Sequence, residues 1–242
     1  KPLWEESISK EWNSLVSLNS FKVVPFSQVP PGTKQLGTKW VFKIKRNKDG
    51  SVDKFKSRLT IQGCGQEMGV NFCSTWAPCA RGTTIKLLFA LAASLGVEVC
   101  TSDVSTAFLY ADVDYDIYCR APKGVNVPAG HCILLLKSVY GIKQAPMLWN
   151  QHVNGTLEKF TWTLPDGTVA PMHRSEVDPC LYWVDGGRYG SLFLALHVDD
   201  MIRVCTSPAL DAAFDGYMDS HYTITHFGRA DQILGCGIDH ED

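Results

Sequence analysis

Residues 191–204 read Ser-Leu-Phe-Leu-Ala-Leu-His-Val-Asp-Asp-Met-Ile-Arg-Val, an apolar run followed by two adjacent carboxylates and a second, shorter apolar run. Apolar runs of this length, without polar residues at helical spacing, are typical of strands that are buried on both faces. Aspartate is a frequent turn residue because its side chain can cap nearby backbone amides. The stretch therefore predicts a β-hairpin that carries Asp199 and Asp200 at its tip, at an exposed edge.

A third carboxylate, together with the acidic pair, indicates a site for a divalent metal, which the pair alone would not establish. Adjacent carboxylates repel each other unless water, a basic group or a cation compensates them, so an isolated pair is also explained by an acidic turn that binds nothing. Asp103, however, ends a short strand that follows Val97. Hard cations such as Mg²⁺ prefer oxygen ligands, and two-metal sites join carboxylates from separate strand ends. Asp103 together with the Asp199–Asp200 pair fits that geometry.

The length and composition indicate a folded globular chain. It has 242 residues, of which 45% are hydrophobic, enough for a substantial core. No apolar run reaches the roughly 18 residues that a transmembrane helix requires, and residues 1–6 lack the pattern of a signal peptide. We therefore expect a soluble intracellular protein, or a fragment of one, with no membrane partner.

The nine cysteines form no Cys-x-x-Cys pair and have no histidine partners at the spacing of a zinc site. They are predicted to be reduced thiols, most of them buried. The alternative, the disulfide framework of a secreted protein, usually has an even number of cysteines in a smaller chain.

Basic residues are concentrated in one segment, although the net charge of the chain is −2. Nine lysines and arginines between Lys34 and Arg58 are accompanied only by Asp49 and Asp53, a local charge of +7. Such a run is either a solvated face or a surface for a polyanion. Side chains two apart in a strand share a face, so Lys43 and Lys45 should project together, while Val41, Phe42 and Ile44 anchor the ribbon.

The turn signals and the periodicity predict the remaining elements. Asp49-Gly50 is a hairpin signal between strands over 38–46 and 51–62. Thr83 should cap a helix that ends at Gly96. Residues 63–82 and 163–174 are predicted to be loops, and Asp112, Asp114 and Asp116 a solvated acidic turn. Further helices are expected over 3–18, 146–160 and 208–219, and further strands over 21–24, 132–137, 180–184, 192–198, 201–205 and 222–227.

Six short segments occur in an order that resembles the reverse transcriptases of Copia-type retrotransposons. They are Lys39–Lys43, Lys56–Leu59, Asp103–Leu109, Tyr140–Pro146, His197–Asp200 and Leu234–Gly235. The resemblance extends over nearly the whole chain. It implies an α+β fold with the fingers and palm of a right-hand polymerase, and the order of strands and helices suits the split βαβ, ferredoxin-like arrangement of a palm. Fingers are expected over 1–82 and 111–144, and palm over 83–110 and 145–242.

The same resemblance implies an RNA-directed DNA polymerase that acts on a primer paired with an RNA or DNA template. Asp103 and Asp199 would bind two Mg²⁺ ions, for which Mn²⁺ could substitute, and Asp200 would complete the catalytic acidic cluster. Deoxynucleoside triphosphates would be the substrates. The expected location is cytoplasmic, in a virus-like particle, or nuclear.

Nucleotide-binding and primer-binding residues are also implied by the resemblance. Arg58 and Lys45 become candidates to hold the triphosphate, because Arg offers a planar fork and Lys a point charge to phosphate oxygens. Phe108 would exclude a 2′-hydroxyl and so select deoxynucleotides. Tyr140 would lie near the template and nucleotide. Leu234 and Gly235 resemble the primer grip, although a plain glycine turn explains that pair equally well.

The sequence departs from the family pattern at three places. His197 stands where the family usually has Tyr, and Ile61-Gln62-Gly63 replaces the familiar Ala-Arg-Gly. The sequence also stops just after the primer-grip-like turn, so thumb and ribonuclease H domains are expected downstream in a full polyprotein. A catalytically silent module that binds nucleic acid or protein is the rival interpretation. A third, an RNA-templated RNA polymerase, is disfavoured by Phe108.

Overall fold

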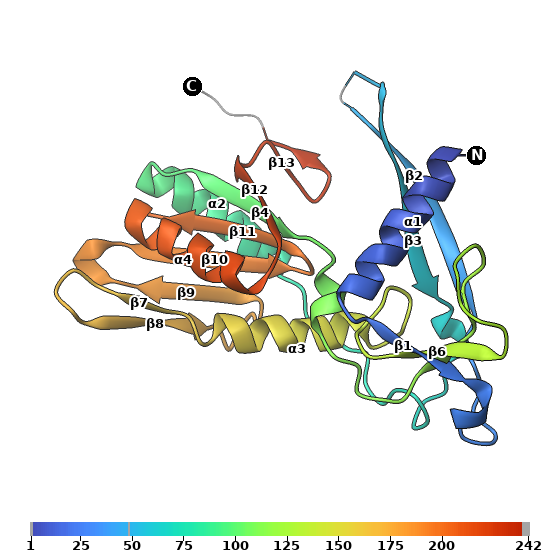
Figure 1. Ribbon diagram of the computed structural model, residues 1–242. Coiled ribbons are helices and arrows are strands. Elements are labelled where there is room, and N and C mark those ends of the chain that lie inside the picture. Colours follow the sequence, from blue (N-terminus) through green and yellow to red (C-terminus); the bar gives the residue numbers. More distant parts are fainter. Residues whose placement is uncertain (1, 48, 239–242) are drawn as a thin grey trace. The chain divides into compact units, whose positions relative to one another are not determined.

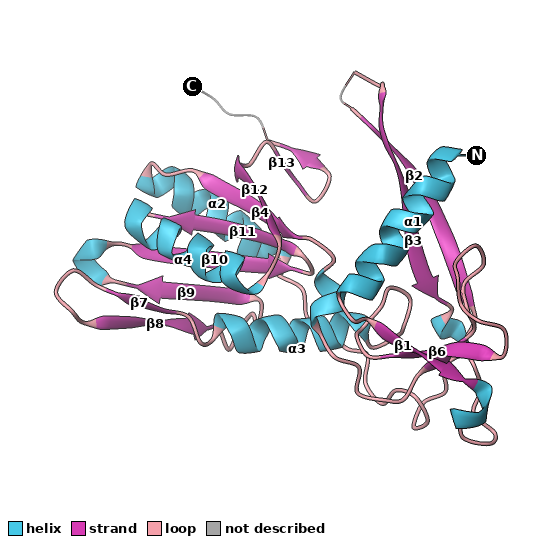
Figure 2. Ribbon diagram, in the orientation of Figure 1, coloured by secondary structure: helices cyan, strands magenta, loops and turns pink. Residues whose placement is uncertain are grey.

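The computed structural model describes residues 2–47 and 49–238, which form a mixed α+β fold (Figures 1 and 2). The chain divides into two compact units. The first contains residues 1–76 and 108–149, and the second contains residues 77–107 and 150–242. The chain therefore crosses from unit to unit after residues 76, 107 and 149, whereas the sequence predicted changes after residues 82, 110 and 144.

The second unit is built on a seven-stranded antiparallel sheet with the strand order β12-β4-β11-β10-β9-β8-β7. Its strands are β4 (Val99–Val104), β7 (Thr161–Thr163), β8 (Val169–Arg174), β9 (Leu181–Asp185), β10 (Ser191–His197), β11 (Asp200–Cys205) and β12 (Ile224–Arg229). Helices α2 (Gly82–Leu95) and α4 (Pro208–His221) pack against β10 and β11. The predicted hairpin over 191–204 thus occupies the interior of the sheet, where its apolar runs are buried on both faces.

Residues 163–174 are not the predicted loop. Val169–Arg174 forms strand β8, which pairs with β7 on one side and β9 on the other. Ala170 and Met172 alternate with exposed residues and point into the core, but they are too few to stand out as a period in the sequence. The Asp166-Gly167 turn between the strands is closed by a hydrogen bond from the Leu164 amide to the Thr168 carbonyl.

The start of helix α2 was also predicted incorrectly. The helix begins at Gly82 after Arg81, and neither Arg81 nor Thr83 caps it through its side chain. Instead the carboxylate of Asp178, from the loop before β9, accepts hydrogen bonds from the Arg81 amide and the Thr84 hydroxyl. The end of α2 is as predicted, because Gly96 adopts a left-handed conformation with φ of 65°.

The first unit combines a three-stranded sheet, a long two-stranded ribbon and helix α1 (Pro2–Ser17). The sheet has the order β1-β6-β5, with β1 (Phe21–Pro25), β5 (Tyr118–Cys119) and β6 (His131–Leu135). The ribbon consists of β2 (Thr38–Arg46) and β3 (Val52–Ile61), which confirms the predicted hairpin, although Lys48 in its turn lies outside the described residues. Helix α1 packs along β3.

The apolar residues of β2 anchor the ribbon only in part, because the Phe42 ring packs against Trp4 of α1, with ring centroids 4.9 Å apart, while all three side chains stay largely exposed. Val41, Phe42 and Ile44 remain 44%, 49% and 41% exposed. The buried part of the ribbon is its other end, where Leu59 and Ile61 enter the core of the first unit. The ribbon therefore projects beyond the core, which reaches the end of β3 and, through Trp40, the start of β2.

The chain also forms helix α3 (Ala145–Leu157) and a short C-terminal hairpin. The hairpin joins β13 (Gln232–Ile233) to β14 (Cys236–Gly237). Leu234 and Gly235 between them have φ values of 50° and 81°, which confirms a two-residue turn. None of the helices in residues 2–47 and 49–238 has the length and apolar character needed to cross a membrane.

All nine cysteines lie within the described residues and are free thiols, as predicted. The expectation that most are buried is wrong, because only Cys119, Cys132 and Cys180 are buried. Most of the others lie in loops or near strand ends, where free thiols can remain in contact with water.

Candidate active site

The β10–β11 hairpin brings the acidic pair to one end of the large sheet. His197 and Asp200 face each other as the last residues of the ladder, and Val198 and Asp199 form the turn between them. Val198 has φ of 61°, a conformation that is a genuine outlier for a β-branched residue. Strained backbone of this kind persists only where the surrounding structure enforces it, and it is concentrated at functional sites. The tip is half-buried rather than fully exposed.

Strand β4 places Asp103 beside this tip. β4 pairs with β11 so that Asp103 lies directly opposite Asp200. The Val104 amide also donates a hydrogen bond of 3.0 Å to the carbonyl of Asp199. Residues that face each other across an antiparallel ladder share a face of the sheet. The structure therefore brings the three predicted acids together.

The electrostatics of the acidic cluster show mutual repulsion. Burial raises the pKa of Asp200, and the negative charges of Asp199 and Asp103 raise this pKa further, whereas His197 acts in the opposite direction. A cation would relieve this repulsion, and oxygen donors of this kind suit Mg²⁺. Within residues 2–47 and 49–238, no three His, Cys, Asp or Glu side chains are already arranged as a metal-binding group. Asp103, Asp199 and Asp200 are nonetheless a donor set of the right chemistry to hold such a cation.

The C-terminal hairpin lies against the same end of the sheet. Asp200 and Leu234 line one small cavity of about 70 Å³, together with residues of β4, β11, β12 and β13. Leu234 is 47% exposed. The predicted primer-grip residues are thus near Asp200, and the turn presents an apolar side chain beside the acidic cluster.

In the first unit, three of the predicted nucleotide-binding residues form a stack. The Arg58 guanidinium carbon lies 4.0 Å from the centre of the Tyr140 ring. The Tyr140 ring lies 4.9 Å from the ring of Phe108, measured between centroids. Lys45 is not part of this stack, because it lies four residues further along β2 than Val41, the partner of Arg58, a distance of about 13 Å along the strand.

One face of the β2–β3 ribbon is almost entirely cationic. Lys43 faces Lys56 and Lys45 faces Lys54, and Arg58 follows on the same face. Like charges directly opposite one another destabilise a sheet. Burial lowers the pKa of Lys56, and the charges of Arg58 and Lys45 lower it further. We call these five residues the basic face of the ribbon; its self-repulsion favours the binding of an anion.

Comparison of the sequence with models of protein families shows which family the chain belongs to. A family model described as "Reverse transcriptase (RNA-dependent DNA polymerase)" matches residues 19–242. The chain belongs to this reverse transcriptase family. Among curated relatives, the "Retrovirus-related Pol polyprotein from transposon TNT 1-94" of Nicotiana tabacum is 33% identical over 235 residues, 96% of this chain and 17% of the relative. The corresponding polyprotein from transposon RE2 of Arabidopsis thaliana is 29% identical over 202 residues, 82% of this chain and 13% of the relative.

These relatives place the chain with the reverse transcriptases of Copia-type retrotransposons, which confirms the resemblance seen in the sequence. The chain spans only about a sixth of the length of the tobacco polyprotein. Among solved structures, a foamy viral protease-reverse transcriptase in complex with double-stranded DNA matches with a TM-score of 0.39 and 12% identity. That match covers 91% of this chain and 30% of the viral chain.

Sequence reasoning missed a buried amide network in the first unit. Gln144 is completely buried, and its amide nitrogen donates to the Asn71 carbonyl and to the Asp114 carboxylate. Gln66 in turn donates to the Gln144 side-chain oxygen at 2.8 Å. The Tyr140–Pro146 segment contains Gln144, and it is therefore fixed by polar contacts as well as by its Gly and Pro. The sequence carries little signal of this network, because Gln144 follows a lysine and its partners lie far away in the chain.

The acidic turn over 112–116 is solvated, as predicted, because Asp112, Asp114 and Asp116 are all exposed, but two of these carboxylates also have partners in the first unit. Asp114 accepts the hydrogen bond from Gln144, and Asp112 forms an ion pair of 2.6 Å with Lys137. These carboxylates thus connect separate segments of the first unit. Their partners are distant in sequence, so the alternating acids alone could not reveal them.

Proposed function

We propose that this chain is the polymerase part of a Copia-type Pol polyprotein and that it catalyses RNA-directed DNA synthesis. It would add deoxynucleotides to the 3′-hydroxyl of a primer paired with an RNA or DNA template. The observation that carries the proposal is the gathering of Asp103, Asp199 and Asp200 at one end of a sheet, in a chain that belongs to the reverse transcriptase family.

The topology of the second unit supports its assignment as the palm. The chain contains β4, α3, β10, β11, α4 and β12 in this order, with other elements between some of them, and the four strands lie side by side in the order β12-β4-β11-β10. The chain passes from β4 through α3 to β10, and β11, the hairpin partner of β10, lies between β4 and β10 in the sheet. This is the split βαβ arrangement. The first unit, with its basic ribbon, would then form the fingers.

In this proposal Asp103 and Asp199 hold two Mg²⁺ ions, which Mn²⁺ could replace, and Asp200 completes the cluster. When bound, the ions make the primer 3′-hydroxyl more acidic and neutralise charge on the departing pyrophosphate. The protein positions both groups and needs no covalent nucleophile. The strained turn at Val198 and the hydrogen bond from Val104 to Asp199 fix the backbone that carries the acids.

The remaining residues bind the substrates. The Arg58 guanidinium and the Lys45 ammonium would hold phosphate oxygens of the deoxynucleoside triphosphate. The Phe108 ring would leave no room for a 2′-hydroxyl, and the Leu234-Gly235 turn would support the primer end. The basic face of the ribbon supplies the positive charge that polyanion binding requires. In the full polyprotein we expect thumb and ribonuclease H domains downstream.

Primer extension tests this function directly. The chain is incubated with a DNA primer on an RNA template, Mg²⁺ and deoxynucleotides at low salt, and it is compared with Asp199→Asn. The wild type should extend the primer, and the substitution should lower the rate by about a thousandfold or more, because a preorganised charge is removed from the transition state.

Glu176→Gln provides a matched control, since it neutralises an exposed acid of the same unit. It should extend the primer at the wild-type rate. Extension by Asp199→Asn at the rate of this control, or no extension by the wild type at high protein concentration, would contradict the proposed function.

A further inference from the structure

In the stack of Arg58, Tyr140 and Phe108, the role of Tyr140 is not explained by the chemistry of nucleotide transfer. Arg58 carries a charge for phosphates, and Phe108 is a steric barrier. Tyr140 contacts both, at 4.0 Å from the guanidinium carbon and 4.9 Å from the Phe108 ring. All three side chains are half-buried, so they are accessible enough to meet a ligand and constrained enough to hold a position.

The backbone around Tyr140 is fixed to the strand that carries Arg58. The Ile61 amide of β3 donates a hydrogen bond of 2.8 Å to the Tyr140 carbonyl. Gly141 has φ of 99°, and a Cβ at this position would lie 2.1 Å from the Ile61 carbonyl oxygen. Only glycine permits so close an approach. The separation between Tyr140 and Arg58 is therefore set by backbone contacts three residues further along the same strand.

Stacking on a ring leaves the chemistry of Arg58 available. The five N–H donors of a guanidinium lie in its plane, so a ring against its face does not occupy them. Among residues 2–47 and 49–238, the Arg58 side chain forms no hydrogen bond or ion pair, although its charge lies near enough to Glu11 to oppose the rise that burial causes in the pKa of that carboxyl group. A long side chain that is ordered before the ligand arrives loses less conformational freedom on binding, an advantage on the order of tenfold in affinity.

Contact with Tyr140 also restrains Phe108. A steric barrier discriminates against a 2′-hydroxyl only if its ring cannot move aside, because discrimination is the difference between the binding of two ligands. The Tyr140 ring packs against Phe108 at a tilt of 58°. Loss of this ring would leave Phe108 more room to move.

We propose that Tyr140 is a positioning residue that orders Arg58 and Phe108 together, so that triphosphate affinity and deoxyribose selectivity depend on one aromatic ring. The proposal rests on the proposed function, in which Arg58 and Phe108 contact the nucleotide. Tyr140 itself acts through these two neighbours.

The test measures nucleotide binding without turnover. The protein is saturated with a primer–template whose primer ends in a dideoxynucleotide, and the dissociation constants of dATP and ATP with Mg²⁺ are measured by calorimetry. Tyr140→Leu should weaken dATP binding about tenfold and lower the dATP-to-ATP selectivity by at least about tenfold. The conservative Tyr140→Phe keeps the ring and should restore both quantities to within about twofold of the wild type.

A double-mutant cycle separates positioning from direct contact. In the Arg58→Ala background, Tyr140→Leu should change dATP affinity less than about twofold, because the effect of Tyr140 on affinity passes through Arg58. Phe26→Leu removes a 51% exposed ring from the same unit and serves as the control for ring loss. Thermal melting verifies that each variant is folded, and Tyr140→Met replaces Tyr140→Leu if the latter is not.

The outcomes distinguish this inference from the proposed function. Unchanged selectivity in a folded Tyr140→Leu or Tyr140→Met protein, or full additivity with Arg58→Ala, would overturn the positioning role. A wild type that binds dATP but never extends an unblocked primer would overturn the polymerase function, while the binding ratios would still decide the role of Tyr140. A wild type that binds neither nucleotide would overturn both.

Discussion

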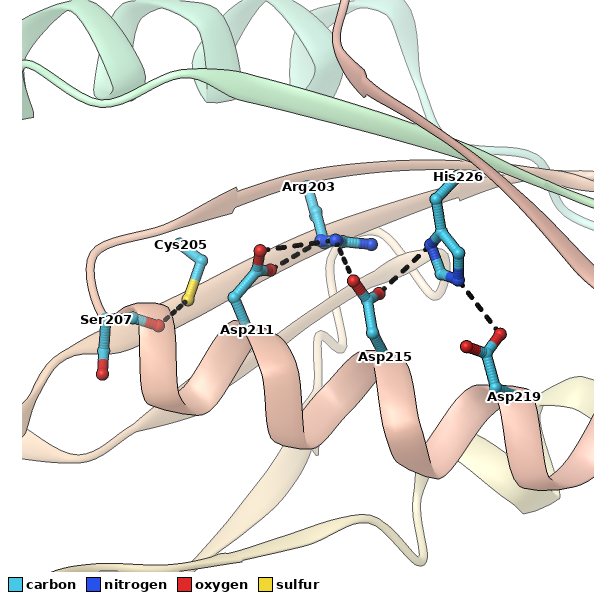
Figure 3. A network of polar contacts seen from close by, with 7 residues as sticks. All are labelled: Arg203, Cys205, Ser207, Asp211, Asp215, Asp219 and His226. Atoms are coloured by element: carbon cyan, nitrogen blue, oxygen red, sulfur yellow. Dashed lines mark hydrogen bonds and ion pairs between the residues drawn. The ribbon is translucent and has the colours of Figure 1, made fainter.

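A buried arginine within the acidic hairpin gives the most quantitative prediction for stability. Arg203 of β11 is 5% exposed, and it donates from Nε to Asp211 and from Nη2 to Asp215, both at 2.7 Å (Figure 3). His226 of β12 connects the network further, lying 3.4 Å from Asp215 and 3.0 Å from Asp219. The network therefore ties α4 to two strands of the sheet, one of which begins with Asp200.

Replacing Arg203 with Met keeps an apolar stem of similar length but removes the cation. Hydrogen bonds to charged groups contribute about 1.5–3 kcal/mol each, and breaking a fully buried ion pair costs about 3–5 kcal/mol. The side chains of Asp211 and Asp215 retain 30% and 29% exposure, so water can replace part of what is lost. We expect Arg203→Met to lower the free energy of unfolding by about 2–4 kcal/mol at neutral pH.

The loss should depend on pH. Burial raises the pKa of Asp215, and Arg203 opposes that rise, so the pKa of Asp215 should be higher still in the variant. A carboxyl group whose folded pKa lies above its unfolded value binds a proton more tightly in the folded state, and it therefore lowers stability as the pH rises through this range. The deficit of Arg203→Met should be largest near pH 8 and smaller near pH 5.

Urea unfolding at pH 8 and pH 5 measures both effects. Arg188→Met is the matched control, because the Arg188 side chain is 77% exposed, and it should change stability by less than about 0.5 kcal/mol. Adding Asp215→Asn to Arg203→Met should recover part of the loss by removing the unpaired charge. A deficit that is equal at the two pH values, or one below about 1 kcal/mol at pH 8, would refute the reasoning.

Three further predictions concern the two units. Gly141→Ala should prevent stable folding of the first unit, measured by circular dichroism, because its Cβ would meet the Ile61 carbonyl at 2.1 Å; retained stability would contradict this packing. Burial acts to raise the pKa of Asp178, but hydrogen bonds from Thr84, Arg81 and Cys180 outweigh it, so this pKa is lowered. This stabilisation is present above about pH 4 and is lost as the pH falls further, so Asp178→Asn should cost about 1–3 kcal/mol at pH 7 and less at pH 3 in urea unfolding. An equal loss at both pH values would exclude that role. Thiol alkylation followed by mass spectrometry should label the exposed Cys64 and Cys236 before the buried Cys180, since burial raises the pKa of Cys180 to about 11; the reverse order would contradict the burial described.

The sequence predicted those parts of the site whose signals are local. The apolar runs around Asp199 and Asp200 predicted a hairpin, and a strand that ends in Asp103 predicted a third acid nearby. The Asp49-Gly50 turn likewise predicted the ribbon, and alternation along its strands predicted that Lys43 and Lys45 share a face. In each case a few neighbouring residues contain the whole pattern.

The features that the sequence did not reveal depend on contacts between distant segments. Asp178 caps α2 from a loop that lies 94 residues beyond Thr84 in the sequence. Local sequence patterns could therefore predict only Thr83 as the cap. The stack of Arg58 on Tyr140 likewise joins residues from separate segments, and neither signals the other. Strand β8 was missed because only Ala170 and Met172 point inward and because Pro171 interrupts the strand pattern.

The position of the acidic hairpin within the sheet has a consequence for local unfolding. β10 and β11 are flanked by β9 and β4, so opening the hairpin requires two further ladders to break. Its backbone amides should exchange with solvent only through global unfolding, whereas the short β13–β14 hairpin, most of whose residues are exposed, can open at little cost. The acids are thus held by the most persistent part of the second unit, beside a turn that is free to fluctuate.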